Sequence, residues 1–437
     1  RRVAAPVPWR MTTSPTLTAP ALLALTALLA GCAPAEEPRS VIAFSGATVW
    51  DGTGAPARPD ATIYVSEGRV LAVTTGGEVP EGAEVLREVD LSGRWVLPGF
   101  VDTHAHASGL WADPSVTGEA ARIRGDLELF ARYGVTTVNS LGDGPAVVAV
   151  RHEAPPTAPH ARLMAAGEVI TDPEVAGARA AAEARADAGV DWLKLRVDDN
   201  LGTSEKMPWE AVQAVIDVGR ERGIPVATHL FYLDDAKRLL DIGTGMVAHS
   251  VRDRDVDAAF IEQLDASGVC YVPTLTREVS TFVYAERPDF FDDDFFLRHA
   301  HPEQVARVSE PDFMARTAAS PAAAGYRAAL EVAMRNVAAL ADAGARVAMG
   351  TDAGAAGRFP GYFEHLELWM MVDAGMTPEQ ALLSATGVAA GCLGRGDVGT
   401  LAPGAWADFV VYAADPLADI RATRSLERVF IAGAELR

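Results

Sequence analysis

The sequence predicts an α/β protein: a (β/α)8 TIM barrel with a small composite β-sandwich domain formed by both chain ends. From Trp95 onward, short apolar runs alternate with Ala- and Glu-rich helical stretches, a pattern typical of parallel βαβ units. On either side of this block the chain consists of short β-type runs separated by turns. The main alternative, an open doubly wound sheet, is disfavoured because no Gly-x-Gly-x-x-Gly motif follows an early strand.

Residues 1–32 are predicted to be a signal peptide. The stretch Ala21–Ala30 is apolar, has the length of a signal-peptide core and is too short for a permanent transmembrane helix. It runs into Leu29-Ala-Gly-Cys32, which resembles the lipobox of bacterial lipoproteins and implies lipidation of Cys32. We therefore expect an extracytoplasmic protein, lipid-anchored to the bacterial cell envelope. The alternative is an ordinary secreted protein with a coincidental cysteine.

The first part of the β-sandwich is predicted at residues 41–94, after a polar, Pro-rich linker at 33–40. Turn signals such as Asp51-Gly52 and Glu67-Gly68 separate short runs of strand-forming residues. The strands expected here are Val41–Phe44, Ala47–Trp50, Thr62–Ser66, Val70–Val73 and Val85–Val89.

The barrel is predicted to span residues 95–395. Its eight expected strands are Trp95–Thr103, Val135–Ser140, Arg162–Ala166, Asp191–Val197, Pro225–His229, Met246–His249, Cys270–Leu275 and Val347–Gly350. Helices are expected between them, for example over Pro173–Ala188 and Trp209–Arg222. The last helix of the block is expected to begin at Thr377-Pro-Glu-Gln, where a capping residue precedes a proline at the first helical position.

The second part of the β-sandwich is predicted at residues 396–437, with strands at Thr400–Leu401, Asp408–Tyr412 and Arg428–Ile431. Neither β-rich piece has enough strands to stand alone, so we expect the two chain ends to combine. Besides Cys32 the chain has only Cys270 and Cys392, too few for a disulfide framework. We expect both to be small buried apolar residues.

The charge of the chain excludes some classes of partner. Its formal net charge is −21 with no compensating basic cluster, which disfavours binding to nucleic acid or to an anionic membrane surface. We expect contact with a membrane only through the lipid anchor. The sequence gives no indication of the oligomeric state.

His104 and His106 end the first predicted barrel strand. Because side chains alternate along a strand, both imidazoles and Asp102 point to one face. The flanking residues are apolar, so this face is expected to be buried. Burying two imidazoles side by side costs free energy unless both are bound, and a transition metal is the usual binding partner.

Further donors occur on other predicted strands, and active sites of (β/α)8 barrels lie at the carboxyl ends of the strands. Lys194 is on the fourth strand, and His229, His249 and Asp352 end the fifth, sixth and eighth. Each has an alternative explanation: the lysine could pair with an acidic neighbour, a histidine could be a core residue, and the aspartate could cap a helix. Together with the first two histidines they form a set suited to holding metal.

Several longer motifs accompany these donors. They are Val49-Trp-Asp-Gly-Thr-Gly, Val96-Leu-Pro-Gly-Phe-Val-Asp-Thr-His-Ala-His, Tyr133-Gly-Val-Thr-Thr-Val, Met376-Thr-Pro-Glu-Gln-Ala-Leu, Ala385-Thr-Gly-Val-Ala-Ala and Gly404-Ala-Trp-Ala-Asp-Phe-Val-Val. In this order and setting, residues 41–437 resemble the amidohydrolase superfamily, in particular its imidazolonepropionase-like and prolidase-like branch. The resemblance identifies the superfamily and does not identify the substrate.

The resemblance implies a site with two divalent metal ions. One would be held by His104, His106 and Asp352 and the other by His229 and His249, with Lys194 bridging them as a carbamate. Zinc is the default metal for these donors, although manganese, iron or cobalt would also suit them. A hydroxide held between the metals would attack the substrate, and Asp352 would shuttle the proton to the leaving nitrogen.

The implied activity is hydrolysis of a carbon–nitrogen, amide-type bond in a small molecule: a cyclic amide, an acylated amino acid or a dipeptide. The closest alternative is a prolidase-like dipeptidase or carboxypeptidase. A deaminase is a further enzyme alternative, which Lys194 disfavours because mononuclear deaminases of this scaffold generally lack that lysine. From another class, a non-catalytic amidohydrolase-like binding lipoprotein would typically have lost metal ligands, and here the set is complete.

Substrate contacts are expected from the loops beyond the strands. Tyr232 and Arg277, each just past a strand end, are candidates for gripping a substrate carboxylate or carbonyl. The aromatic-rich segment 277–321 is long enough to form a lid over the site. Its aromatic side chains would either enclose an apolar part of the substrate or only pack the lid onto the barrel.

Overall fold

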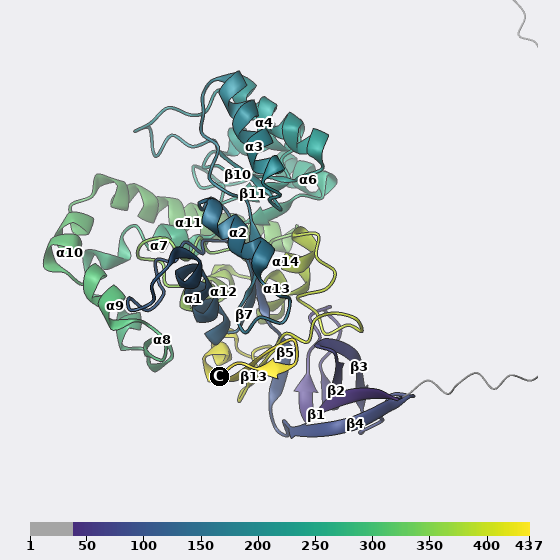
Figure 1. Cartoon of the computed structure of the whole chain (residues 1–437). Helices are drawn as coiled ribbons and strands as arrows, with labels where there is room; N and C mark the ends of the chain where they lie inside the picture. The colour runs from purple at the N-terminus through teal and green to yellow at the C-terminus, as the bar shows by residue number, and fades with distance from the viewer. Residues whose placement is uncertain (1–37) are drawn as a thin grey trace, which may run out of the picture. The chain divides into compact units, whose positions relative to one another are not determined.

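Strands from both ends of the chain build one eight-stranded sheet in the computed structural model, which describes residues 38–437 (Figure 1). The sheet runs in the order β15-β14-β13-β5-β1-β2-β3, with β4 paired to β1. Its strands are β1 (Arg39–Val49), β2 (Arg58–Ser66), β3 (Arg69–Thr75), β4 (Ala83–Asp90), β5 (Trp95–Pro98), β13 (Phe409–Tyr412), β14 (Leu426–Ile431) and β15 (Ala434–Glu435).

This sheet differs from the predicted pair of stacked sheets in being continuously hydrogen-bonded. The reason is the length of β1, which pairs with β4 along its first half and with β5 through Thr48 and Val49. The sheet still encloses a core of its own, in which the ring of Phe44 lies 5.0 Å from the rings of both Phe409 and Phe430. The predicted strand Thr400–Leu401 is not formed.

The N-terminal predictions lie mostly outside the described residues. These are the signal peptide at 1–32, with the lipobox cysteine Cys32, and most of the linker. Arg39 and Ser40, which the sequence analysis assigned to the linker, belong to β1.

The rest of the chain contains two parallel sheets. One has the order β6-β7-β8 and the other β12-β11-β10-β9. Their strands are β6 (Phe100–Ala105), β7 (Val135–Ser140), β8 (Arg162–Ala165), β9 (Leu193–Arg196), β10 (Val226–His229), β11 (Met246–Ala248) and β12 (Cys270–Val272).

The predicted strand Trp95–Thr103 is two strands, β5 and β6, which belong to different sheets. The break falls at Gly99, where a Cβ atom would come within 2.2 Å of the Thr136 side chain on β7. Glycine thus leaves room for the Thr136 side chain at the point where the chain passes from one sheet to the other.

Backbone hydrogen bonds connect the two parallel sheets on both sides. The Asp191 amide donates to the Ala165 carbonyl over 2.8 Å, between the segments that carry β9 and β8. On the other side, the Ala348 amide donates to Tyr271 over 2.9 Å and the Thr103 amide donates to Met349 over 3.0 Å. The predicted strand Val347–Gly350 is therefore a connecting segment with one isolated β-bridge, between Val347 and Tyr271.

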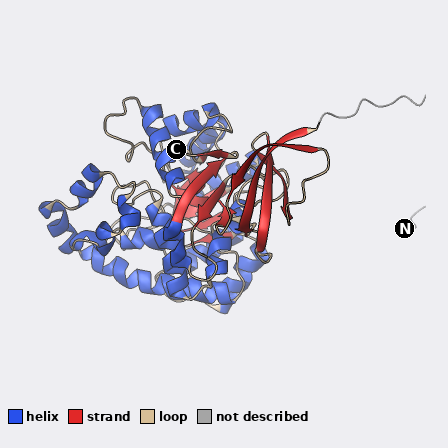
Figure 2. Ribbon diagram, turned by 90° about the horizontal axis from the view of Figure 1, so that it is seen from below, coloured by secondary structure: helices blue, strands red, loops and turns tan. Residues whose placement is uncertain are grey.

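Helices pack around the parallel strands, whereas the eight-stranded sheet is not enclosed by helices (Figure 2). They are α1 (Glu119–Arg132), α2 (Pro145–Glu153), α3 (Val175–Asp187), α4 (Trp209–Arg222), α5 (Leu233–Ile242), α6 (Ala258–Ser267), α7 (Leu275–Val279), α8 (Asp294–Leu297), α9 (Pro302–Val308), α10 (Pro311–Ala318), α11 (Pro321–Asp342), α12 (Tyr362–Ala374), α13 (Pro378–Ser384) and α14 (Gly387–Cys392). The predicted cap at Thr377 is confirmed: its side chain accepts from the Gln380 amide, and the Gln380 side chain accepts from the Thr377 amide. Among residues 38–437, no helix combines the length and apolarity needed to cross a membrane.

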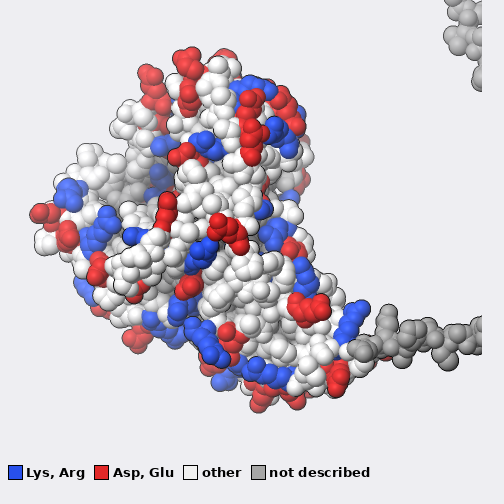
Figure 3. Space-filling view, in the orientation of Figure 1, with Lys and Arg blue, Asp and Glu red and all other residues white. Residues whose placement is uncertain are grey.

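Acidic and basic side chains lie interspersed over the face of the molecule drawn in Figure 3. Several form ion pairs between elements that are neighbours in space, such as Arg179 on α3 with Glu221 on α4. Exposed pairs of this kind contribute little to stability, on the order of 1 kcal/mol or less each.

The expectation for the two remaining cysteines is wrong. Cys270, the first residue of β12, and Cys392, the last residue of α14, form a disulfide with their Cα atoms 5.9 Å apart. Sequence spacing could not indicate this pairing, because 122 residues separate the two cysteines and only the fold brings them together.

Removing this disulfide is expected to destabilise the protein markedly. A cross-link that closes a loop of 122 residues restricts the unfolded chain, which corresponds to about 4–5 kcal/mol in the chain-entropy treatment. We expect Cys392→Ser to lower the midpoint of chemical denaturation under non-reducing conditions. Reductant should lower the midpoint of the wild type and leave that of the variant unchanged. Two free thiols in the native wild-type protein, at these two cysteines, would contradict the pairing.

A candidate metal centre

Three predicted donors meet at the carboxyl end of β6. The Nε2 atom of His106 lies 2.8 Å from Oδ1 of Asp352, and Nε2 of His104 lies 3.4 Å from the same oxygen. One nitrogen or oxygen donor atom from each of the three residues lies within 4.8 Å of the other two. This spacing suits a set of ligands around one cation.

The other three predicted donors lie next to this group. The Nζ atom of Lys194 is 3.2 Å from Nε2 of His104. The ring of His249 is centred 4.5 Å from that of His104 and 4.1 Å from that of His229. The structure therefore brings together all six side chains, which the sequence scatters over about 250 residues.

Unusual backbone conformations mark the same end of the strands. His249, Thr274 and Asp352 have φ angles of 73°, 49° and 60°, in the left-handed region that residues other than glycine rarely adopt. Each follows one of the neighbouring segments β11, β12 and 346–350. Backbone strain of this kind is commonly stored where side chains must be aimed at a functional site.

Burial keeps most of these nitrogen donors uncharged. It lowers the pKa of Lys194 to about 7 and that of His229 to about 3, and it holds the pKa values of His104 and His249 well below the usual histidine range. A neutral imidazole offers the lone pair that a metal needs, and Nε2 of His104 is the ring nitrogen that faces Asp352 and Lys194. The chemistry of this donor set therefore fits a transition-metal site.

His106 and Asp352 behave differently because they face opposite charges. Burial works against a charged ring, but Asp143 and Asp352 outweigh it and raise the pKa of His106 to about 10. Burial alone would raise the pKa of Asp352, but the Arg358 guanidinium and His106 hold it well below the usual range. The carboxylate is thus ionised, as both a metal ligand and a proton acceptor must be.

The outer nitrogens of the histidines are held by residues that the sequence analysis did not assign to the site. Nδ1 of His106 lies 3.2 Å from Asp143, Nε2 of His229 lies 2.8 Å from Asp198, and Nδ1 of His249 lies 2.7 Å from the Thr274 hydroxyl. Asp198, an acidic residue near Lys194 in the sequence, thus pairs with His229. Partners of this kind fix ring orientation and tautomer.

Residues 95–436 match the Amidohydrolase family. The chain belongs to this family. It is accordingly a metal-dependent hydrolase that acts on carbon–nitrogen bonds, with His104, His106 and Asp352 as its candidate metal site.

Among curated proteins, this amidohydrolase is similar to imidazolonepropionases. That of Deinococcus radiodurans is 26% identical over 414 residues, covering 86% of this chain and 92% of its own length. That of Nocardia farcinica is 29% identical over 387 residues, covering 80% of this chain and 84% of its own.

Solved structures show the same fold at low sequence identity. A Xaa-Pro dipeptidase with methionine bound in its active site is 21% identical with a TM-score of 0.69, and the match covers 90% of this chain and 99% of the dipeptidase. Phenylurea hydrolase B is 22% identical with a TM-score of 0.68, and the match covers 90% and 96%. Molinate hydrolase is 20% identical with a TM-score of 0.69, and the match covers 91% and 95%.

The carboxylate of Asp143 gives a test of how the amidohydrolase holds its histidines. It lies against His106 and accepts from the Ser140 hydroxyl and the Ala107 amide. Asp143→Asn keeps the shape but removes the charge, and should weaken metal affinity by about 10–100-fold. Competition with a chromophoric chelator measures the effect. Asp217→Asn, at a partly exposed residue on α4, is the control, and equal affinities in the two variants would contradict this role of Asp143.

The two predicted substrate contacts lie in different surroundings. The Tyr232 hydroxyl donates to Asp199 over 2.8 Å, and the Lys206 ammonium lies 3.8 Å from the centre of its ring, so the tyrosine tip is engaged by neighbours. Arg277 is buried, and its Nη1 contacts both carboxylate oxygens of Glu278 at 2.9 and 3.0 Å. The charge of Arg277 reaches the site: it contributes to the lowered pKa of His229.

The aromatic residues of the segment 277–321 are largely packing residues. Phe291, Phe295 and Phe296 are buried, and the ring of Phe296 contacts those of Phe359 and Tyr362 at 4.8 and 5.0 Å. Of the two roles considered for these side chains, attachment of the segment to the rest of the protein is the one that their contacts support.

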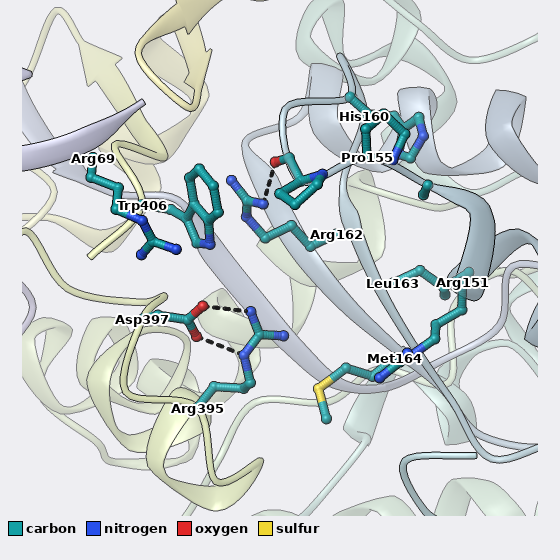
Figure 4. A pocket seen from close by; sticks show the side chains of 13 residues that line it. Arg69, Arg151, Pro155, His160, Arg162, Leu163, Met164, Arg395, Asp397 and Trp406 are labelled. Carbon is teal, nitrogen blue, oxygen red and sulfur yellow. Dashed lines mark hydrogen bonds and ion pairs between the residues drawn. The ribbon is translucent and has the colours of Figure 1, made fainter. Parts of the chain in front are cut away.

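A cavity of about 340 Å³ lies away from the candidate metal centre, against Trp406 and the start of β8 (Figure 4). Three of its four arginines are paired with carboxylates: Arg395 with Asp397, Arg162 with Asp408 and Arg151 with Asp191. None of the six predicted donors lines it. Most of its arginines are therefore neutralised by carboxylates of the protein, and the cavity is not the catalytic site of the amidohydrolase.

Proposed function

We propose that the chain hydrolyses an amide-type carbon–nitrogen bond in a small molecule with the help of two divalent metal ions. The observation that carries the proposal is the convergence of four histidines, one lysine and one aspartate from five separate segments of the chain. We further propose that the two parallel sheets and the segment 346–350 together form a closed (β/α)8 barrel. The backbone hydrogen bonds on both sides of the sheets support this closure.

The donors divide naturally into two sets. His104, His106 and Asp352 would hold one ion and His229 and His249 the other. Lys194, as a carbamate, would contribute an oxygen to each. The lysine is 2% exposed, and burial lowers its pKa to about 7, so a neutral amine able to add carbon dioxide is accessible. Zinc is the metal we propose first for these donors.

Asp352 is the residue we assign to proton transfer. When bound, the ions would polarise the scissile carbonyl and lower the pKa of water at the site toward about 7. The ionised Asp352 carboxylate would accept the proton of the attacking water and deliver it to the leaving nitrogen. Its two oxygens suit this role because only Oδ1 faces the imidazoles of His104 and His106.

The substrate class rests on the relatives and on the charge near the site. The similar proteins are named for an imidazolone, a Xaa-Pro dipeptide and a phenylurea, which favours a small molecule. The similarity to a dipeptidase keeps a prolidase-like activity as the alternative. Among the predicted contacts, Arg277 remains a candidate for the substrate, whereas the engaged hydroxyl of Tyr232 makes it a weaker one.

We propose that the protein works outside the cytoplasm, with Cys32 as its lipid attachment site. The disulfide between Cys270 and Cys392 supports export, because such bonds persist mainly in oxidising compartments. Metabolic labelling with a radioactive fatty acid would test the anchor: wild type should be labelled and Cys32→Ser should not. Equal labelling, or none in the wild type, would contradict the lipidation.

The activity is tested with a substrate panel on metal-loaded protein. N-acyl-L-amino acids, Xaa-Pro and other dipeptides, lactams and aryl ureas are incubated with it, and release of amine is followed by mass spectrometry. We expect turnover of one class, loss of turnover after chelation, and recovery when zinc is returned. No turnover of any class by the metal-loaded protein would contradict the proposal.

A further inference from the structure

Asp352 has one oxygen on each side of the candidate site. Its Oδ1 faces His106 at 2.8 Å and His104 at 3.4 Å. Its Oδ2 contacts the guanidinium of Arg358, which no prediction from the sequence assigned to the site. The arginine therefore contacts the carboxylate oxygen that is not the one facing the imidazoles.

Arg358 is held in this place by its backbone. It closes a tight turn, in which its amide donates to the Ala355 carbonyl over 3.0 Å and its carbonyl accepts from the Gly354 amide over 2.9 Å. Gly354 has φ +90°, and a Cβ atom there would come within 1.9 Å of the His106 carbonyl oxygen. The turn thus presses against the strand that carries the histidines, and only glycine permits this approach.

Side chains from two other segments hold the same turn. The Trp111 indole donates to the Gly354 carbonyl over 2.8 Å, and the Tyr284 hydroxyl donates to the Gly357 carbonyl. The guanidinium of Arg358 is held as well, because its Nε donates to the Ser280 hydroxyl over 2.9 Å. A guanidinium anchored at Nε and aimed by a supported turn is preorganised for an anion.

Arg358 would lack a full negative counter-charge once a cation is bound by Asp352. Within residues 38–437, Asp352 is the only carboxylate within 4.0 Å of its nitrogens. A divalent cation held by Asp352 would draw on the same negative charge, which leaves the guanidinium with a surplus. Arg277 differs, because its Nη1 contacts both oxygens of Glu278. The Arg358 side chain is 17% exposed, so a small molecule can reach it.

We propose that Arg358 binds a carboxylate of the substrate next to the scissile carbon–nitrogen bond, which makes the enzyme selective for N-acyl amino acids or dipeptides over their uncharged analogues. The inference rests on the proposed function and narrows its substrate class. A guanidinium binds a carboxylate through parallel N–H donors. The substrate carboxylate would take the place of Oδ2 of Asp352 at the guanidinium and leave that oxygen free to accept a proton.

Matched pairs of compounds test the proposal. Each hydrolysed N-acyl-L-amino acid or dipeptide is compared with its carboxamide, for example N-acetyl-L-leucine with N-acetyl-L-leucinamide. We expect the wild type to favour the acid by about 10–100-fold in kcat/KM, the range of one or two charge-assisted hydrogen bonds. Arg358→Met should abolish the preference mainly through a higher KM for the acid. Arg358→Lys, which keeps the positive charge but lacks the parallel N–H donors of the guanidinium, should retain part of the preference for the acid.

Control measurements separate binding from general damage. Arg287→Met, at an exposed arginine of the segment 277–321 that pairs with Asp292, should keep the full preference. The free amino acid product should inhibit the wild type at least about 10-fold more strongly than the amino acid amide, and this difference should vanish in Arg358→Met. A wild type indifferent to the carboxylate, or an Arg358→Met variant that keeps the preference, would overturn the inference.

The role of Arg358 can be tested separately from the proposed hydrolytic activity. If metal-loaded wild type hydrolyses no compound of the panel, the proposed function fails. Calorimetric titration of the metal-loaded protein with N-acetyl-L-leucine and its amide then decides the role of Arg358 alone. Tighter binding of the acid that is lost in Arg358→Met upholds it, and equal binding of acid and amide by the wild type overturns it.

Discussion

Asp352→Asn should lower kcat for the hydrolysed substrate by about 10²–10⁴-fold, the usual contribution of a positioned proton-transfer group. Asparagine keeps the size of the side chain and one oxygen that can face His106 and His104, but it cannot accept a proton. Much of the bound metal should remain, because the other five donors are unchanged. The measurement is steady-state kinetics together with the metal content of the same preparation.

The comparison needs a variant that changes a carboxylate elsewhere. Asp217→Asn on α4 serves here too, since Asp217 pairs with Arg220 at the surface, and its kcat should match that of the wild type. An Asp352→Asn enzyme with bound metal and nearly full activity would refute the assignment of proton transfer to Asp352.

Lys194→Ala should abolish turnover and reduce the metal content to about one ion or fewer per chain. The lysine is buried beside His104, and apart from Asp352, which belongs to the first set of ligands, none of the other predicted donors is a carboxylate. Removal of the carbamate would leave two cations facing each other with less negative charge between them, which is unfavourable in a buried site.

A carbamate also has signatures of its own. Protein exchanged into ¹³C-labelled bicarbonate should show a carbamate carbon signal in the wild type and not in Lys194→Ala. Short carboxylic acids such as acetate should restore part of the metal binding and activity to the variant, because they supply the missing oxygens. Full metal content and normal turnover in Lys194→Ala without any added acid would contradict a bridging role.

The residues at strand ends were predictable because they follow a local rule. A polar donor at the end of an apolar strand indicates a functional residue. This pattern identified His229 and His249 without any knowledge of tertiary contacts. Asp143 could have been found in the same way, since it follows the end of β7 by three residues. It was missed because Leu141 and Gly142 separate it from the strand.

Arg358 and the disulfide could not be predicted in this way. Arg358 lies six residues beyond Asp352, and only the turn built on Gly354 brings its guanidinium back to the carboxylate. The pairing of Cys270 with Cys392 depends on where α14 lies relative to β12. In both cases the decisive contact is tertiary, and neither the spacing nor the type of the residues carries that information.

Two of the predicted barrel strands differ from the strands that the structure contains. The apolar run from Trp95 to Thr103 has a uniform strand pattern, yet Gly99 divides it between two sheets because Thr136 leaves no room for a side chain there. The segment Val347–Gly350 has the pattern of a strand and lies between β12 and β6, but makes too few regular hydrogen bonds to be one.

The metal stoichiometry of the full-length protein is the most direct test of the central claim, that six side chains share a pair of cations. Protein depleted with a chelator, reloaded with zinc and freed of excess metal is analysed by inductively coupled plasma mass spectrometry. The account predicts two zinc ions per chain. A protein that binds no zinc, or that still binds two per chain after His104 and His249 are both replaced by alanine, would contradict it.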